Sequence, residues 1–165
     1  MATKIKSPTG LVSAKEIAKA IRLDHLGVLG TSVGWLLMKV LKISVLNKIY
    51  DRNKHLSDLA FIDALLLEFD IKFEIPPEDL KRIPKSGPFI TISNHPLGGI
   101  DGILLLKLLL EQRPEFKIIA NFLLHRILPL KPYVMPVNPF EGRKGAHNSI
   151  AGFKSALNHL NQGHG

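Results

Sequence analysis

The sequence contains no cysteine among its 165 residues. This absence excludes a disulfide scaffold, a thiolate-bound metal or iron–sulfur site, and a cysteine nucleophile. Aromatic residues are scarce, at 7%, and no basic run is interleaved with them. Stacking on single-stranded nucleic acid therefore has little support, and we expect no nucleic-acid partner. The first ten residues are polar and lack the apolar core of a secretory signal.

Long uncharged runs are also missing. The longest early one, Leu26–Met38, contains 13 residues before Lys39 and Lys42 interrupt it. As a helix it would reach about 20 Å, which is short of the ~30 Å hydrocarbon layer of a bilayer. We interpret this region as an element that lies on a membrane surface or packs on a core.

Positive charge is concentrated at one end of the chain. Residues 1–54 contain ten Lys and Arg but three Asp and Glu, so they carry +7 of the total net charge of +8. Basic segments of this kind attract nucleic acid or anionic membranes. With nucleic acid disfavoured, the charge pattern indicates an anionic phospholipid surface as the partner.

Three helices are predicted in the first half of the chain. Residues 13–16, Ser-Ala-Lys-Glu, have the spacing of a capping box, which predicts a helix start. Gly27, Gly30 and Gly34 are expected to weaken the helix that follows. A second helix is predicted at residues 35–50 and a third at 58–69, each from apolar residues at helical spacing. The apolar stripe of the second is flanked by lysines and suits either a lipid surface or a core; it consists of Leu37, Val40, Leu41 and Val45.

The second half has an α/β pattern. We predict short strands at residues 71–75, 89–92, 116–120 and 133–137, and helices at 100–110, 122–128 and 148–161, the last capped by Gly163. Strands that alternate with helices favour parallel βαβ crossovers. The predicted fold class is therefore α/β, with a helical, membrane-associating region at 1–80 and a mainly parallel βαβ core at 81–165. The sequence ends where a further strand is expected, so we expect a core truncated at its C-terminus.

Residues 94–102, Asn-His-Pro-Leu-Gly-Gly-Ile-Asp-Gly, carry the most informative pattern. They follow a predicted strand, and open α/β sheets bind ligands at the carboxyl ends of their strands. His95 and Asp101 can meet only if the chain folds back between them, and Gly98 and Gly99 permit the dihedral angles that this needs. Asp101 would then lie in the first turn of a helix and accept a hydrogen bond from Nδ1 of His95, leaving Nε2 as a base.

A simpler interpretation of the same residues exists. Asn94 or Asp101 could only cap a helix, with His95 in an ordinary loop. The other six histidines have no motif around them and are expected to have surface or packing roles. No His-Glu-x-x-His or Walker A motif is present, and we predict no metal site.

Residues 94–102 resemble motif I of the glycerolipid, or lysophospholipid, acyltransferases. The common family pattern has four residues between His and Asp, whereas five intervene here, as in the bacterial branch called hemolysin-like or ornithine/glycine-lipid acyltransferases. The resemblance covers about residues 80–165. It implies an α/β acyltransferase core whose third motif, Phe-Pro-Glu-Gly, would follow the last predicted helix.

The resemblance also implies an activity. His95 would take the proton from a substrate hydroxyl, Asp101 would orient His95, and the oxygen would attack the thioester of acyl-CoA or acyl-carrier protein, with no other cofactor. Asn94, Gly98 and Gly99 would form the substrate-binding loop. The family's second motif, which binds the phosphate of the acceptor, would correspond to Arg143 and Lys144. A solvated basic turn is the alternative for those two residues.

The implied protein is a peripheral enzyme on the cytoplasmic face of the inner membrane, with a lysophospholipid or lyso-aminolipid as acceptor. Two other classes stay open. One is a non-catalytic lipid-binding or scaffold protein with the same fold. The other is an α/β hydrolase or thioesterase that uses water, although the absence of a Gly-x-Ser-x-Gly elbow counts against a serine enzyme.

Overall fold

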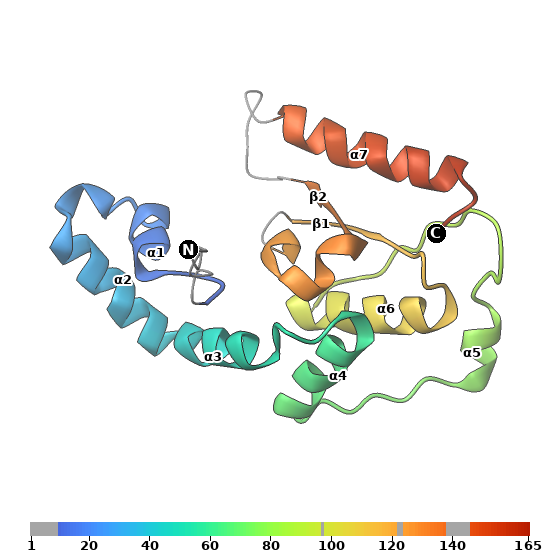
Figure 1. The fold of residues 1–165 in the computed structure, drawn as a ribbon, viewed down its shortest axis with the longest axis horizontal. Coiled ribbons are helices and arrows are strands. Elements are labelled where there is room, and N and C mark those ends of the chain that lie inside the picture. Colours follow the sequence, from blue (N-terminus) through green and yellow to red (C-terminus); the bar gives the residue numbers. More distant parts are fainter. Residues whose placement is uncertain (1–9, 97, 122–123, 138–145) are drawn as a thin grey trace, which may run out of the picture. The chain divides into compact units, whose positions relative to one another are not determined.

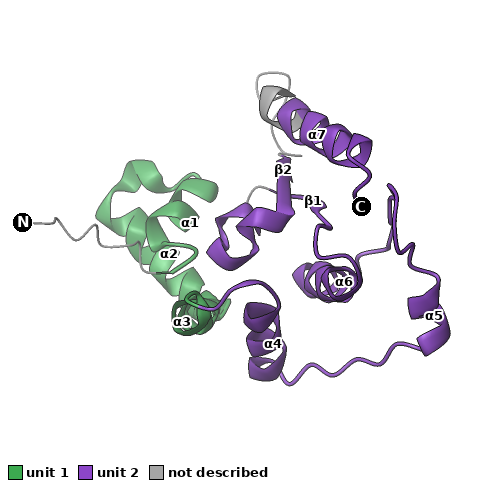
Figure 2. Cartoon of the chain, turned by 45° about the vertical axis from the view of Figure 1, so that its right-hand side comes forward, with its two compact units in different colours: residues 1–55 green, residues 56–165 purple. Residues whose placement is uncertain are grey.

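The computed structural model describes residues 10–96, 98–121, 124–137 and 146–165. The chain divides into two compact units, residues 1–55 and residues 56–165 (Figure 2). Each unit has its own buried apolar side chains, and each is described by itself below. The division into a membrane-associating region, 1–80, and a core, 81–165, concerns function and stays a prediction.

The first unit is helical. It consists of α1 (Ala14–Ala20), a short 3-10 turn η1 (Asp24–Leu26), α2 (Val28–Val40) and α3 (Ile43–Asn53) (Figure 1). The capping box predicted at the start of α1 is confirmed. The backbone N–H of Glu16 donates to Oγ of Ser13 at 3.3 Å, and that of Ser13 donates to Oε2 of Glu16 at 2.8 Å. Two free N–H groups at the helix start are thereby satisfied.

The single helix predicted at residues 35–50 is wrong, because two helices with a break between them occupy this region. Lys42 has φ of +55°, in the left-handed region, so the right-handed helix cannot continue through it. No glycine or proline marks the break, which is why the helical spacing does not reveal it. Within the described ranges no single helix has the length and hydropathy to cross a bilayer, and α2 and α3 meet that criterion only as a pair bent by 76°.

Gly30 and Gly34 lie inside α2 rather than before it, and both are buried. A Cβ atom at Gly30 would lie 1.8 Å from the carbonyl oxygen of Leu23, and one at Gly34 would lie 2.2 Å from that of Ala14. These distances are shorter than any contact that carbon and oxygen tolerate. The two glycines therefore allow α2 to lie close to α1 and to Leu23, which follows α1 in the chain. This close packing compensates for the low helix propensity of glycine.

The second unit combines helices with a small sheet. Its helices are α4 (Asp58–Glu68), α5 (Pro77–Lys81), α6 (Gly99–Gln112) and α7 (Ala146–Asn161), and its strands are β1 (Ile118–Asn121) and β2 (Val134–Val137). The strands are parallel, with Ile118 opposite Val134, and the 3-10 segments η2 (Leu124–Arg126) and η3 (Leu128–Tyr133) lie between them in the chain. Figures 1 and 2 show α7 on one side of the sheet and α6 on the other.

The predicted helices at 58–69, 100–110 and 148–161 and the predicted strands at 116–120 and 133–137 are confirmed within two residues at each end. The short helix predicted at 122–128 begins outside the described residues, and the described part forms 3-10 turns. Gly163 caps α7 as predicted: it has φ of +86°, and the N–H groups of Gly163 and His164 donate to the carbonyls of Leu160 and His159.

The strands predicted at 71–75 and 89–92 are wrong, since neither segment pairs with another strand. A strand needs a hydrogen-bonded neighbour, and β-forming residues alone do not supply one. Ile90 and Ile92 are 73% and 95% exposed, so the second segment is not part of a buried sheet. The α/β class therefore holds for the described residues in a limited form, as a mostly helical unit with two parallel strands.

The core of the second unit lies among α4, α6, η3 and β2. Its largest fully buried side chains are Phe61, Ile62, Leu106, Leu109 and Leu130. Nζ of Lys107 on α6 lies 2.8 Å from Oδ1 of Asp63 on α4 and also pairs with Glu111. Burial opposes the charge of Lys107, but its hydrogen bonds to these two carboxylates outweigh this effect and raise its pKa. The ion pair with Asp63 thus links α4 and α6 at the edge of the core.

The close approach at Gly34 leads to a testable consequence. We expect Gly34→Ala to destabilise the first unit by about 1–3 kcal/mol, because the added methyl group would meet backbone atoms of α1 that cannot move aside. Thermal unfolding followed by circular dichroism measures this. Ser32→Ala, at an exposed position of the same helix, is the matched control. Equal melting temperatures for the two variants would show that α1 and α2 are not packed this closely.

Candidate active site

The structure brings His95 and Asp101 together. Nδ1 of His95 lies 3.6 Å from Oδ2 of Asp101. The chain turns back at Gly98, whose N–H donates to the carbonyl of His95 at 3.4 Å and whose φ is +65°. A side chain at Gly98 would strain this conformation, so the predicted glycine bend is confirmed there. Gly99 is the first residue of α6, with ordinary helical backbone.

The α6 helix places the carboxylate. Asp101 lies in the first turn of α6, as predicted. The free N–H groups at a helix start carry partial positive charge, which stabilises a carboxylate there. The prediction that the pair follows a strand end is wrong, since residues 89–94 are not a strand. The start of a helix, rather than a sheet edge, therefore positions the pair.

The two side chains differ in exposure. The side chain of His95 is 57% exposed, while that of Asp101 is 20% exposed. Nδ1 faces the carboxylate, and among the described residues none hydrogen-bonds to Nε2. The distance of 3.6 Å is slightly longer than a hydrogen bond, which is common for catalytic groups before substrate binds. The arrangement can therefore hold an imidazole by one nitrogen and present the other to a substrate.

The remaining predicted site residues are distributed as follows. Asn94 is exposed and adjoins His95. Gly98 forms the bend that leads into α6, and Gly99 is the first residue of that helix. Arg143 and Lys144 lie outside the described residues. The described part of the predicted site therefore lies in the first turn of α6 and in the residues just before that helix.

A cluster around Arg113 was not predicted from the sequence. Arg113 directly follows α6 and is only 5% exposed. Nε donates to Oε1 of Glu115 at 2.6 Å. Partial burial opposes ionisation of Glu115, but its own backbone N–H and the Arg113 guanidinium outweigh this and lower its pKa. The sequence signal was weak, because an Arg near a helix end usually faces solvent.

His159 belongs to the same region. It is 8% exposed, and its Nε2 lies 2.9 Å from the carbonyl oxygen of Glu115. Burial, together with the nearby charges of Lys117 and His164, lowers the pKa of His159. The packing role expected for this histidine is therefore confirmed.

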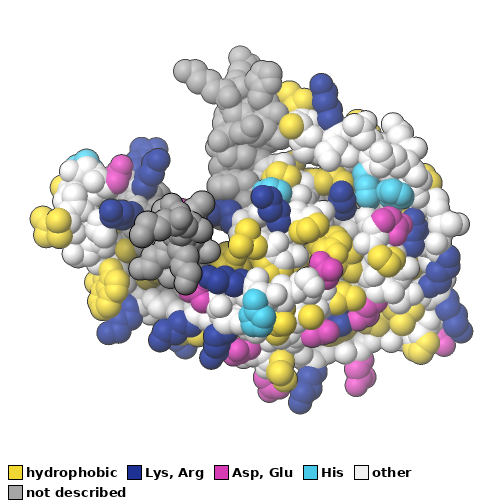
Figure 3. All heavy atoms as spheres, in the orientation of Figure 1, with side chains coloured by type: hydrophobic (Ala, Val, Ile, Leu, Met, Phe, Trp, Pro, Cys, Tyr) yellow, Lys and Arg dark blue, Asp and Glu magenta, His cyan; other side chains and the backbone are white. Residues whose placement is uncertain are grey.

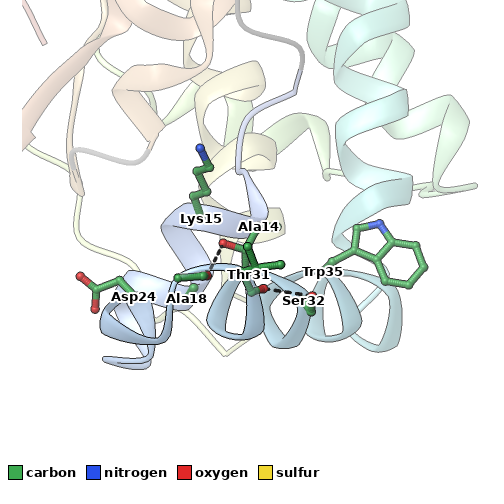
Figure 4. A pocket seen from close by; sticks show the side chains of 9 residues that line it. Ala14, Lys15, Ala18, Asp24, Thr31, Ser32 and Trp35 are labelled. Carbon is green, nitrogen blue, oxygen red and sulfur yellow. Dashed lines mark hydrogen bonds between the residues drawn. The ribbon is translucent and has the colours of Figure 1, made fainter.

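A pocket of about 620 Å³ lies in the first unit, between α1 and α2 (Figure 4). Thr31 and Ser32, which line it, donate their hydroxyls to carbonyls of their own helix at 3.0 Å. The pocket thus offers mainly apolar surface and contains neither His95 nor Asp101. Among the described residues no group of three metal-ligating side chains is found.

His95 faces a largely covered carboxylate with one ring nitrogen, and its side chain is exposed to solvent. Such a histidine defines a candidate general-base site. The comparison with protein families agrees: the model described as "Acyltransferase" matches residues 16–153, and the chain belongs to this family.

Two curated relatives are both named lyso-glycine lipid O-acyltransferase. The protein of Bacteroides thetaiotaomicron is 30% identical over 103 residues, which cover 62% of this chain and 37% of the relative. That of Phocaeicola vulgatus is 32% identical over 94 residues, which cover 56% of this chain and 33% of the relative. The chain thus spans about a third of the length of the curated relatives it matches. No solved structure matches the chain.

The geometry predicts the protonation pattern of the His95 ring. With Asp101 facing Nδ1, the neutral ring should carry its proton on Nδ1, and Asp101→Ala should shift the proton population toward Nε2. Long-range ¹H–¹⁵N correlation spectra of the ring measure this. Glu111→Ala, which removes a carboxylate from the other end of the same helix, is the control. A ring pattern that Asp101→Ala leaves unchanged would contradict the assigned pairing.

Proposed function

We propose that the chain carries the general-base site of an O-acyltransferase. The enzyme moves a fatty acyl group from an acyl thioester to the hydroxyl of a lysolipid. The single observation that carries the proposal is the contact between His95 and Asp101 at the start of α6, in a chain that belongs to the acyltransferase family.

The proposed reaction uses one base and no covalent enzyme intermediate. Nε2 of His95 removes the proton from the acceptor hydroxyl as its oxygen attacks the thioester carbonyl. The new C–O bond forms, the C–S bond breaks, and the proton passes from Nε2 to the leaving thiolate. Asp101 keeps Nδ1–H in place and stabilises the transient positive charge of the ring.

The exposures of the two residues support these roles. A base that must receive a bulky lipid acceptor has to be accessible, and His95 is more than half exposed. A carboxylate that only orients the base need not meet substrate, and Asp101 is largely covered. The N-terminal end of α6 adds a favourable field for Asp101.

The substrates follow from the relatives by analogy. The relatives' printed names indicate a lyso-glycine lipid, so we propose a lyso-aminolipid or lysophospholipid as acceptor. Acyl-carrier protein or coenzyme A is the proposed acyl carrier. Arg143 and Lys144 are proposed to bind an anionic group of the acceptor, since an Arg fork can engage two oxygens of a phosphate.

We also propose that the first unit binds the cytoplasmic face of the inner membrane peripherally. Several apolar side chains of α2 and the adjoining break are exposed, with Val28 83%, Leu29 71% and Val40 66% exposed. Lysines and arginines lie among exposed apolar side chains on the face of this unit seen in Figure 3. Apolar insertion combined with positive charge suits an anionic lipid surface better than either alone.

Loss of the base tests the proposed chemistry. We expect His95→Ala to lower acyl transfer by about 10²–10⁴-fold, the usual contribution of a general base, while circular dichroism stays unchanged. Transfer of a radiolabelled acyl group from acyl-carrier protein to lysolipid is the measurement. His55→Ala, at an exposed histidine without a motif, is the control.

Each other outcome of this assay has a definite meaning. Undiminished transfer by His95→Ala would refute the general base. Membrane binding without consumption of thioester would favour the non-catalytic lipid-binding alternative. Release of free fatty acid without an acceptor would favour a thioesterase.

Membrane binding is tested separately by sedimentation with vesicles. We expect the chain to bind vesicles that contain anionic phospholipid, and added salt should weaken the binding by screening the charges. Lys39→Glu combined with Lys42→Glu should reduce binding, whereas Lys81→Glu, an exposed lysine of α5, should not. Equal binding to neutral and anionic vesicles would reject the electrostatic contribution.

A further inference from the structure

Arg113 connects four segments of the second unit. Its Nη1 donates to the carbonyl of Pro84 at 2.8 Å, and its Nη2 donates to the carbonyl of Gly87 at 3.0 Å and to that of Gly163 at 3.4 Å. Its Nε donates to Glu115. The guanidinium thus joins the end of α6, the loop before residue 88, the end of α7 and the segment that leads to β1.

The guanidinium also fixes Phe89. Its central carbon lies 5.1 Å from the centre of the Phe89 ring, which in turn lies 5.6 Å from the ring of Phe116. A cation over an aromatic face is attracted to it, and the attraction is stronger when both are shielded from water. Phe89 is the first residue of the segment 89–95 that leads to His95, so Arg113 helps to fix where this segment begins.

The extended segment of residues 89–95 is about as long as the stretch of α6 between Asp101 and Arg113. Asp101 and Arg113 are separated by twelve positions of α6 and its end, or about 18 Å of helix. Phe89 and His95 are six positions apart, or about 20 Å of extended chain. One end of the segment is fixed beside Arg113, and the other end reaches Asp101. Residues 89–95 must therefore retrace nearly the full length of α6 in extended form.

Between its two ends, this segment has few attachments to the rest of the described chain. Residues 90–94 are all exposed and are not a strand. No backbone hydrogen bond joins residues 89–94 to another part of the described chain. The position of His95 is therefore set from the two ends. The bend at Gly98 acts at one end, and at the other Phe89 lies against Arg113, Phe116 and Gly165.

We propose that Arg113 is a positioning residue that holds the extended segment in register, so that His95 meets Asp101. This inference rests on the proposed function for its catalytic consequence, but its structural content does not depend on it. A lysine would keep the charge, yet its single ammonium cannot engage three carbonyls and a ring in one plane. Arg113→Lys should therefore let residues 89–95 slip along α6 without removing any group that meets substrate.

The test uses this chain with Arg113→Lys, and with Arg113→Met as a second variant that replaces the buried charge by an apolar side chain. Lys85→Ala is the matched control, because Nζ of Lys85 links the same loop to Gln112 at the end of α6 but lies at the surface. Ile62→Ala, in the fully buried part of α4, controls for a general loss of stability.

The first readout is the tautomer ratio of the His95 ring. It is measured by long-range ¹H–¹⁵N correlation on variants whose circular dichroism is native. We expect Arg113→Lys to lower the ratio of Nδ1–H to Nε2–H tautomer at least threefold, while Lys85→Ala and Ile62→Ala leave it unchanged. An unchanged ratio in both Arg113 variants would overturn the inference. So would an equal change in Ile62→Ala, because Arg113 would then act only through overall stability.

The second readout is acyl transfer. We expect Arg113→Lys to lower kcat about 10–100-fold with little change in KM, since misplacing a base by about 1 Å costs rate rather than binding. A raised KM at constant kcat would contradict positioning. Failure of the proposed function shows differently: His95→Ala would transfer as well as the unchanged chain, while the tautomer ratio would still respond to Arg113.

Discussion

A carboxylate at the positive end of a helix is the constraint on which the site depends. Asp101 lies in the first turn of α6 with its side chain largely covered, where the free N–H groups of the helix favour a carboxylate. Its oxygen then determines which nitrogen of His95 faces the protein. The bend at Gly98 lets two residues six positions apart meet in this way.

The rest of the second unit keeps that helix and that loop in place. Leu106, Leu109 and Leu110 of α6 are buried, α6 packs beside α4, and the ion pair between Lys107 and Asp63 joins the two helices. At the other end of α6, Arg113 donates hydrogen bonds to the carbonyls of Pro84 and Gly87. The same helix therefore supplies the carboxylate at its start and the attachment of the histidine segment at its end.

The sequence predicted local features better than non-local ones. The capping box of Ser13 and Glu16, the bend at Gly98 and the position of Asp101 depend on neighbouring residues, and the structure confirms them. The strand at 89–92 was wrong because a strand needs a partner that its own residues cannot specify. The break at Lys42 and the buried Arg113 were missed for a similar reason, since neither residue type signals its conformation or burial.

The most direct test of the account is a double-mutant cycle on acyl transfer with His95→Ala, Asp101→Ala and the two combined. If Asp101 acts by orienting His95, the combined variant should lose no more kcat/KM than His95→Ala alone. Losses that multiply in the combined variant would show that the two residues act independently, and the central claim would be contradicted.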